Sequence, residues 1–323
     1  MSVPHSTVRF ADLPLQRPGP PFNAWGLYGP DDELGRLNLI TPESVQRARD
    51  AIKQGVSVNL NLPMSSHPLH PARPKLEHEI KNRVHANDDQ LSFNTQTSTQ
   101  IDGFRHYPYQ NYPREGEYLF YGGMSSDEAK NPGVLRNGIQ NFAKRPINSR
   151  GHLLDIALYL QHHGLPPLSP FDASTPISAS LLQSCAEWHG VEFLPGDILL
   201  LRTGFTEAFS GLGENQRIGF KDKEDRGSCG VSPDEQVLQW HWDRGIAAVM
   251  TDTVAYEVTP FANKPSIHEV FLAGWGLPIG ELLDLRELSQ KCREAQQYTF
   301  MFTCAPLYVN GGIASPANAS AIL

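Results

Sequence analysis

Alternating apolar and polar residues at several places along the chain predict β-strands. The longest alternation is LSFNTQTSTQID, residues 91–102, whose period of two predicts one continuous strand. Its polar face carries six side chains: Ser92, Asn94, Gln96, Ser98, Gln100 and Asp102. Gly103 then interrupts the pattern, so Asp102 and His106 are expected where a strand ends in a loop, a common place for chemistry. The alternative is a solvated strand face followed by a surface turn.

Further strands are predicted by shorter patterns. VSVNLNLPM (56–64) and YTFMFTCAPLYV (298–309) alternate, whereas GDILLLRTGF (196–205) and GIAAVMTDT (245–253) have the apolar runs of buried strands. Asp252 ends the last of these runs. An acid at the end of a buried strand either holds a site together or caps the following turn.

Helix signals lie between the strands. TPESVQRARDAIKQG predicts a helix that Thr41 caps and Gly55 stops. Ser232 with Glu235, and Ser266 with Glu269, have the spacing of capping boxes. The second box predicts a short helix that ends at Gly274 and places His268 in its first turn. The helix dipole disfavours an imidazolium there, so His268 is expected to be neutral, as a metal ligand must be.

Because strands and helices interleave without a repeat or a long linker, we predict a single compact α/β domain over residues 41–323. Residues 1–40 are rich in Pro and Gly and predict an irregular N-terminal arm packed on the body.

Composition narrows the class of protein. The chain has 323 residues, of which 40% are hydrophobic and 19% charged, as in globular proteins. A net charge of −8 with dispersed acids argues against nucleic-acid and membrane partners. We expect no signal peptide, and the four widely spaced cysteines, which form no C-x-x-C pair, favour a reducing, cytoplasmic compartment. The motifs of serine hydrolases, P-loop NTPases, dinucleotide-binding enzymes and zincins are absent from the sequence.

Two segments together resemble a known family. TSTQIDGFRH (97–106) and IHEVFLAGWGLPIGE (267–281) are similar to the two site segments of the metal-dependent cyclase family, which includes bacterial kynurenine formamidase and isatin hydrolase. WGLYGPDDELGRLNLITPE, NSRGHLLDIA, LPGDILLLRTGF and GGIASPANA resemble the branch in which T-Q-x-D-G replaces T-H-x-D. The resemblance covers roughly residues 24–321. It implies an α/β fold of the swivelling β/β/α type, assembled as a homodimer or homotetramer.

The resemblance also implies roles for individual residues. Asp102 matches a metal-binding carboxylate, His106 the general base and acid, and His268 and Glu281 the remaining ligands. Gln96 and Gln100 stand where the family has its two signature histidines, and an amide oxygen is a weaker donor than imidazole. We therefore expect one divalent ion, Mn²⁺ or Zn²⁺ with Mg²⁺ as a further option, held by Asp102, His268 and Glu281 with help from a glutamine oxygen. A metal-free site stays open.

Three functions follow. The first is a hydrolase of a small amide, lactam or lactone, in which a metal activates water and His106 moves the proton. The second is a lyase, dehydratase or cyclase acting on a small oxygenated or polyketide-like metabolite with weak metal binding or none. The third is an inactive member that binds a small molecule.

Three further residues are candidates for substrate binding. Tyr107 and Tyr121 could line a pocket for a planar ring, although aromatic residues in loops more often anchor the core. Arg150 could bind a substrate carboxylate, and an internal ion pair is the alternative.

Overall fold

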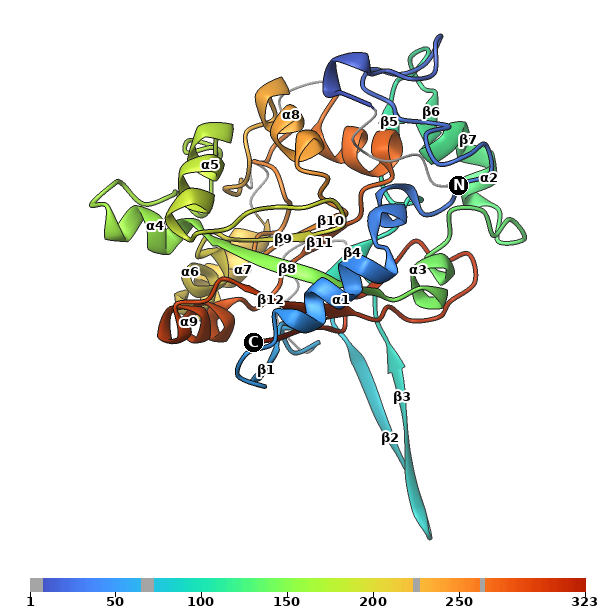
Figure 1. The fold of residues 1–323 in the computed structure, drawn as a ribbon. Coiled ribbons are helices and arrows are strands. Elements are labelled where there is room, and N and C mark those ends of the chain that lie inside the picture. Colours follow the sequence, from blue (N-terminus) through green and yellow to red (C-terminus); the bar gives the residue numbers. More distant parts are fainter. Residues whose placement is uncertain (1–7, 65–72, 223–226, 262–264) are drawn as a thin grey trace.

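The computed structural model describes residues 8–64, 73–222, 227–261 and 265–323, and in these ranges a mixed nine-stranded sheet forms the centre of the protein (Figure 1). The order of the strands across the sheet is β1 (Ser57–Asn59), β14 (Ala319–Ile322), β12 (Thr299–Cys304), β8 (Ile147–Asp155), β9 (Ile198–Arg202), β10 (Ala248–Thr251), β11 (Ile279–Glu281), β4 (Gln100–Asp102) and β13 (Ala314–Pro316). The four strands β8 to β11 are parallel, and the pairs on either side of them are antiparallel.

Apolar layers cover both faces of the sheet. In β9, Ile198 and Leu200 belong to one core cluster and Leu199 and Leu201 to the other. Strands buried on both faces need continuous apolar sequence, which explains the ILLL run. The helices are α1 (Pro42–Asp50), α2 (Ser126–Lys130), α3 (Gln140–Lys144), α4 (Ile156–His162), α5 (Ala179–Trp188), α6 (Phe205–Gly211), α7 (Glu214–Asp222), α8 (Glu235–Asp243), α9 (Arg286–Ala295) and the π-helix η5 (Glu269–Trp275). The predicted single α/β domain is confirmed.

The N-terminal segment is irregular, as predicted, and residues 1–7 of the expected arm lie outside the described residues. The 3-10 turns η2 (Phe10–Asp12) and η3 (Gly35–Leu39) are its regular elements within the described residues up to 40. Trp25 Nε1 donates to the Ala273 carbonyl at 2.7 Å, and the buried Arg36 donates from Nε to the Ile246 carbonyl at 2.6 Å. These long-range bonds fix the segment on the body.

Two predicted helix boundaries need correction. Thr41 caps α1 by accepting a hydrogen bond from the Ser44 amide, but the helix ends at Asp50, before the predicted stop at Gly55. The cap of α8 is Asp234, which accepts from the Val237 amide, and not Ser232. Asp234 directly precedes the first residue of α8, so it takes the capping position that was predicted for Ser232, two residues earlier.

The predicted continuous strand over residues 91–102 is wrong. Its first two residues end β3 (Ala86–Ser92), which forms a separate hairpin with β2 (Glu77–Arg83), and its last three are β4. Between them the chain turns, because the Asn94 side chain accepts a hydrogen bond from the Gln96 amide and the Asn94 carbonyl accepts from the Thr97 amide. Only residues 100–102 enter the main sheet.

A smaller sheet joins β5 (Tyr109–Gln110), β6 (Tyr118–Phe120) and β7 (Met124–Ser125), with the 3-10 turn η4 (Tyr121–Gly123) between the last two. Within the described ranges, every helix is too short or too polar to cross a bilayer.

Candidate metal centre

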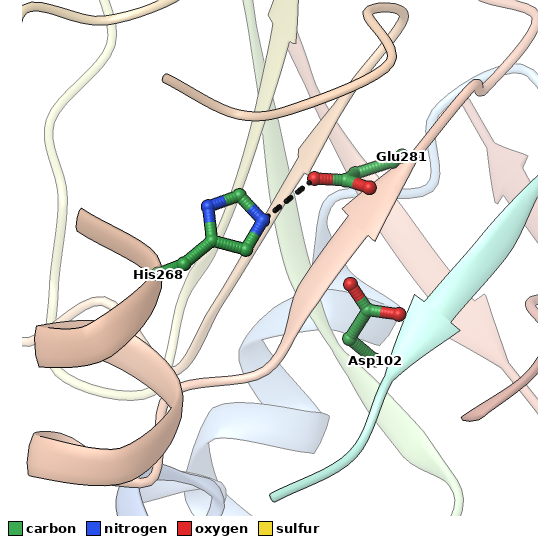
Figure 2. Close-up of side chains that lie close together, drawn as sticks. All are labelled: Asp102, His268 and Glu281. Carbon is green, nitrogen blue, oxygen red and sulfur yellow. Dashed lines mark hydrogen bonds and ion pairs between the residues drawn. The ribbon is translucent and has the colours of Figure 1, made fainter. Parts of the chain in front are cut away.

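Two neighbouring antiparallel strands and the start of a π-helix bring three ligand types together. In the register of β4 and β11, Glu281 lies opposite Gln100, and Ile279 lies opposite Asp102. Gln100 and Asp102 are two residues apart, so they share one face of β4. His268 enters from the residue before η5. One ligand atom from each of Asp102, His268 and Glu281 lies within 4.8 Å of the others, and all three residues are buried (Figure 2).

Glu257 orients His268. The His268 Nδ1 atom lies 3.0 Å from Glu257 Oε1, and the fully buried Glu257 carboxylate also accepts from the Ile267 and His268 amides at 2.9 and 2.8 Å. This leaves Nε2 facing Glu281 Oε1 at 3.1 Å. A carboxylate behind a histidine is a common way to fix the ring of a metal ligand. Glu257 was not predicted from the sequence, although an acid between Tyr256 and Val258, in a chain segment this apolar, is a signal of a buried carboxylate.

The expected capping box of η5 is present, since the Ser266 amide donates to Glu269 Oε2 and the Glu269 amide donates to Ser266 Oγ. The neutral state expected for His268 is that of a metal-bound imidazole, and the metal-free site favours the protonated form. Burial lowers the pKa of His268, but the hydrogen bonds to Glu257 and Glu281 outweigh it and raise the pKa to about 10. The two carboxylates at hydrogen-bond distance stabilise the protonated imidazole more than the helix N-terminus destabilises it. A metal ion at Nε2 would take the place of the proton.

The two glutamines connect the carboxylates. Gln96 Nε2 donates to Asp102 Oδ1, and Gln100 Nε2 donates to Gln96 Oε1 at 2.8 Å and to Glu281 Oε2 at 2.9 Å. The amide groups therefore hold Asp102 and Glu281 in fixed orientations. Among the described residues, Gln100 Oε1 has no hydrogen-bond partner, so its lone pairs stay available to a cation.

The site fits a divalent cation. Asp102 Oδ2 is buried and has no hydrogen-bond partner within the described part of the chain. Burial raises the pKa of Asp102, and the charge of Glu281 acts in the same direction against the opposing effect of His106. Buried acceptors of this kind carry a free-energy cost that a positive ion removes. Carboxylate and amide oxygens with one imidazole suit Mn²⁺, Zn²⁺ and Mg²⁺.

A cavity of about 350 Å³ opens beside these ligands. His106, His268 and Glu281 line it, together with Tyr107 and Phe261. The half-buried His106 ring places Nε2 at 3.8 Å from Asp102 Oδ2. Tyr107 and Phe261 contact the His268 ring, with ring centroids 5.6 and 5.0 Å away. The site thus combines three residues of metal-ligand type with two aromatic side chains, and the His106 imidazole lies beside Asp102.

Arg73 also lines the cavity and donates from Nη1 to the Gln96 carbonyl at 2.8 Å. Arg73 was not predicted as a site residue, and its surroundings in the sequence, PARPK, give no signal of a site.

Two of the expected substrate-binding residues lie elsewhere. Tyr121 is buried against Phe104, and its hydroxyl donates to Asp32 Oδ2 at 2.8 Å. Arg150 forms an ion pair with Asp197 at 2.7 Å, which is the alternative considered for it. Neither is among the described residues that line the cavity.

Asp252 accepts hydrogen bonds from the Thr203 and Gly204 amides and from the Thr203 hydroxyl. It therefore caps the turn that follows the neighbouring strand β9, and not the turn after Asp252 that was considered for it.

The comparisons with known proteins agree with this architecture. The Cyclase family model, described as "Putative cyclase", matches residues 58–258. The crystal structure of a novel cyclase aligns with a TM-score of 0.81 at 27% identity, covering 94% of this chain and all of that one. This similarity confirms the predicted cyclase-type α/β fold.

More distant structures share the fold alone. Isatin hydrolase A from Labrenzia aggregata, bound to benzyl benzoate, aligns with a TM-score of 0.55 at 16% identity over 85% of this chain and 94% of its own. A predicted metal-dependent hydrolase from Bacillus stearothermophilus aligns with a TM-score of 0.51 at 13% identity over 82% of this chain and 97% of its own. No curated protein sequence matches the chain. The match over residues 58–258 and the shared fold place this chain in the cyclase family.

Proposed function

We propose that this protein is a metal-dependent hydrolase of a small amide, lactam or lactone. The observation that carries the proposal is the convergence of Asp102, His268 and Glu281 to within 4.8 Å beside a cavity of about 350 Å³. The buried Oδ2 atom of Asp102, which accepts no hydrogen bond from the described residues, supports a cation at this point. Isatin hydrolases and a predicted metal-dependent hydrolase among the proteins of this fold agree with the reaction class.

One divalent ion would be held by Asp102, His268 and Glu281, with Gln100 Oε1 as a further donor. Such an ion polarises a substrate carbonyl and lowers the pKa of water. Gln96 holds the Asp102 carboxylate, and Gln100 holds that of Glu281, so the ligands are fixed before a substrate arrives.

His106 serves as the general base and acid. Its ring lines the cavity next to Asp102, so it can take a proton from an attacking water and return it to the leaving group. Tyr107 and Phe261 pack against the His268 ring at the cavity and offer flat surfaces to a planar substrate.

The test measures two quantities, the bound metal per chain and the turnover rate. Elemental analysis should find close to one divalent ion per wild-type chain and little in Glu281→Ala. His106→Ala should keep the metal and lose roughly a hundredfold or more in turnover, as the loss of a general base does. His162→Ala, at the exposed end of α4, is the control and should change neither quantity. Wild-type protein with no metal, or His106→Ala with normal turnover, would remove the basis of the proposal.

A lyase, dehydratase or cyclase is the second candidate. It is favoured by one observation: Gln96 and Gln100 point their amide nitrogens, which donate hydrogen bonds and bind no metal, at the carboxylates. A metal-poor site would suit proton transfer better than hydrolysis. Product mass distinguishes the two, since hydrolysis adds one water, elimination removes one and isomerising cyclisation changes nothing. Tight binding of a metabolite without turnover would instead identify an inactive binding protein.

We further propose a cytoplasmic setting, which the four buried, unpaired cysteines support.

A further inference from the structure

The cavity beside the ligand cluster has an apolar lining and a charged one. The apolar lining includes the side chains of Phe220, Val254, Phe261 and Leu282. Among the described residues that line the cavity, Arg73 is the one whose side chain carries a permanent positive charge. A molecule that enters this cavity therefore meets an apolar surface and a single guanidinium group.

Two hydrogen bonds hold the segment that carries Arg73 at the site. Arg73 Nη1 donates to the Gln96 carbonyl at 2.8 Å, and Thr97 Oγ1 donates to the Pro74 carbonyl at 3.2 Å. The Gln96 side chain in turn donates to Asp102 Oδ1. Arg73 is thus linked to the ligand set through Gln96, and its position is fixed before a substrate arrives.

The charge of Arg73 has no counterion at contact distance. Within the described part of the chain, the hydrogen bond to the Gln96 carbonyl is the one that Arg73 donates, and it forms no ion pair. Arg150, which is also half-buried, pairs with Asp197 at 2.7 Å. Burial lowers the pKa of the Arg73 guanidinium, and the negative charges of Glu281 and Asp102 oppose this effect. The guanidinium therefore lies near these two carboxylates without contacting either.

We propose that Arg73 binds a carboxylate group of the substrate, so that the substrate is a small amide, lactam or lactone whose apolar body carries one carboxylate. The inference rests on the proposed hydrolase and names the substrate class of the same cavity. A guanidinium binds a carboxylate through two parallel hydrogen bonds, and the N–H groups of Arg73 that do not contact Gln96 are sufficient for them. Arg73 lies outside the segments that carry the family resemblance, so the resemblance gives it no role.

The charges and the size of the cavity favour a small monoanion. Glu281 lines the cavity, and a carboxylate oxygen of Asp102 lies within 4.8 Å of the Glu281 carboxylate. A dianionic group such as phosphate would be repelled by these carboxylates more strongly than a carboxylate group. The volume of about 350 Å³ is at the lower end for sites that bind small molecules.

Binding of small acids and of the matching amides tests the role of Arg73 without an assay of turnover. Benzoate, phenylacetate and 3-phenylpropionate are compared with benzamide, phenylacetamide and 3-phenylpropanamide by titration calorimetry, because the two members of each pair have the same shape and differ in charge. Wild-type protein should bind at least one acid about tenfold or more tightly than its amide, as a charge-assisted pair does.

Three variants locate the acid. Arg73→Gln should lose the preference for the acid and keep its affinity for the amide. Arg73→Lys, which keeps the charge but not the planar pair of donors, should fall between wild type and Arg73→Gln. Arg293→Gln removes the same charge from an exposed position of α9, so it is the control and should keep the full preference.

The following outcomes would overturn the role of Arg73. One is a wild type that prefers none of the three acids. Another is a preference that persists in Arg73→Gln, which would place the acid on a metal ion or on His268. A third is a parallel loss of metal and of amide affinity in Arg73→Gln, which would show that Arg73 acts only as a support for Gln96.

The metal content of the same samples separates this proposal from the hydrolase. Wild-type protein without metal that still prefers the acid through Arg73 would refute the hydrolase and keep Arg73 as a carboxylate-binding residue. Wild-type protein with metal and no preference for an acid would refute the role of Arg73 alone.

Discussion

Replacing Glu257 with glutamine should weaken metal binding although Glu257 is not itself expected to touch the metal. Its carboxylate accepts three hydrogen bonds, from the Ile267 amide, the His268 amide and His268 Nδ1, at 2.8 to 3.0 Å. Glutamine has one acceptor oxygen, so its amide nitrogen must face at least one of these N–H groups. With the glutamine oxygen at the Oε1 position, only the Ile267 amide loses its acceptor, and with the amide nitrogen there, both His268 bonds are lost; in either orientation His268 Nδ1 loses its charged acceptor.

The magnitude follows from these contacts. One buried N–H group without a partner costs about 1–3 kcal/mol of folding free energy. Loss of the carboxylate behind a ligating histidine typically reduces metal affinity by about 10 to 100-fold. At about 1.4 kcal/mol per tenfold change, this corresponds to roughly 1.4–2.8 kcal/mol of binding free energy.

The assay is a competition between the metal-free protein and a chromogenic chelator for Zn²⁺ or Mn²⁺. Glu269→Gln is a matched control: it is the same substitution at another buried glutamate, the first residue of η5, that also accepts backbone hydrogen bonds, from Gln110 and Ser266. We expect both variants to lose stability and only Glu257→Gln to lose metal affinity. Equal metal affinity in Glu257→Gln and wild type would refute the orienting role of Glu257.

Three further predictions concern stability. Burial lowers the pKa of His241 to about 3 from 6.5, so the neutral ring contributes stability that is fully present above pH 6.5 and is lost as the pH falls toward 3. The loss is on the order of 2 kcal/mol of unfolding free energy by pH 5. Denaturant unfolding should therefore show a smaller difference in unfolding free energy between pH 7 and pH 5 in His241→Gln than in wild type. Gly276→Ala should cost about 1–3 kcal/mol more than the control Gly55→Ala, because both glycines have positive φ but only the Gly276 methyl would collide with Gly35 and Tyr121; equal losses would contradict this. Excess Mn²⁺ or Zn²⁺ should raise the melting temperature of wild type and not of Asp102→Asn, and an equal rise would place the ion elsewhere.

The sequence predicted the composition of the site better than its geometry. Alternation placed Gln96, Gln100 and Asp102 on one strand face, and the structure does bring them together, but a turn at Asn94 achieves this for Gln96. Local patterns reveal the period of an element and its caps. They do not reveal which of several nearby side chains accepts the backbone hydrogen bond at a turn or at a helix start, as Asn94 and Asp234 show.

Side-chain contacts between residues far apart in the chain were the hardest feature to predict from the sequence. The state of His268 depends on Glu257, whose identity as a neighbour comes from tertiary packing and not from the helix that carries the histidine. Arg150 forms its ion pair with Asp197, a residue 47 positions away in the chain, and this partner could not be read from the sequence around Arg150. The ligand set itself was accessible because the family resemblance supplied the pairing of two segments that spacing alone left unconnected.

The position of β4 determines when the site can form during synthesis. Among the described strands, β4 (residues 100–102) pairs with β11, at residues 279–281, and with β13, at residues 314–316. A nascent chain therefore carries Asp102 on an unpaired segment until nearly all of the protein has left the ribosome. Such late, non-local pairing is slow to form, and the ligand cluster assembles in one of the last steps of folding. A chain ended before residue 279 should accordingly be cut by protease at residues 100–102, where the full chain resists.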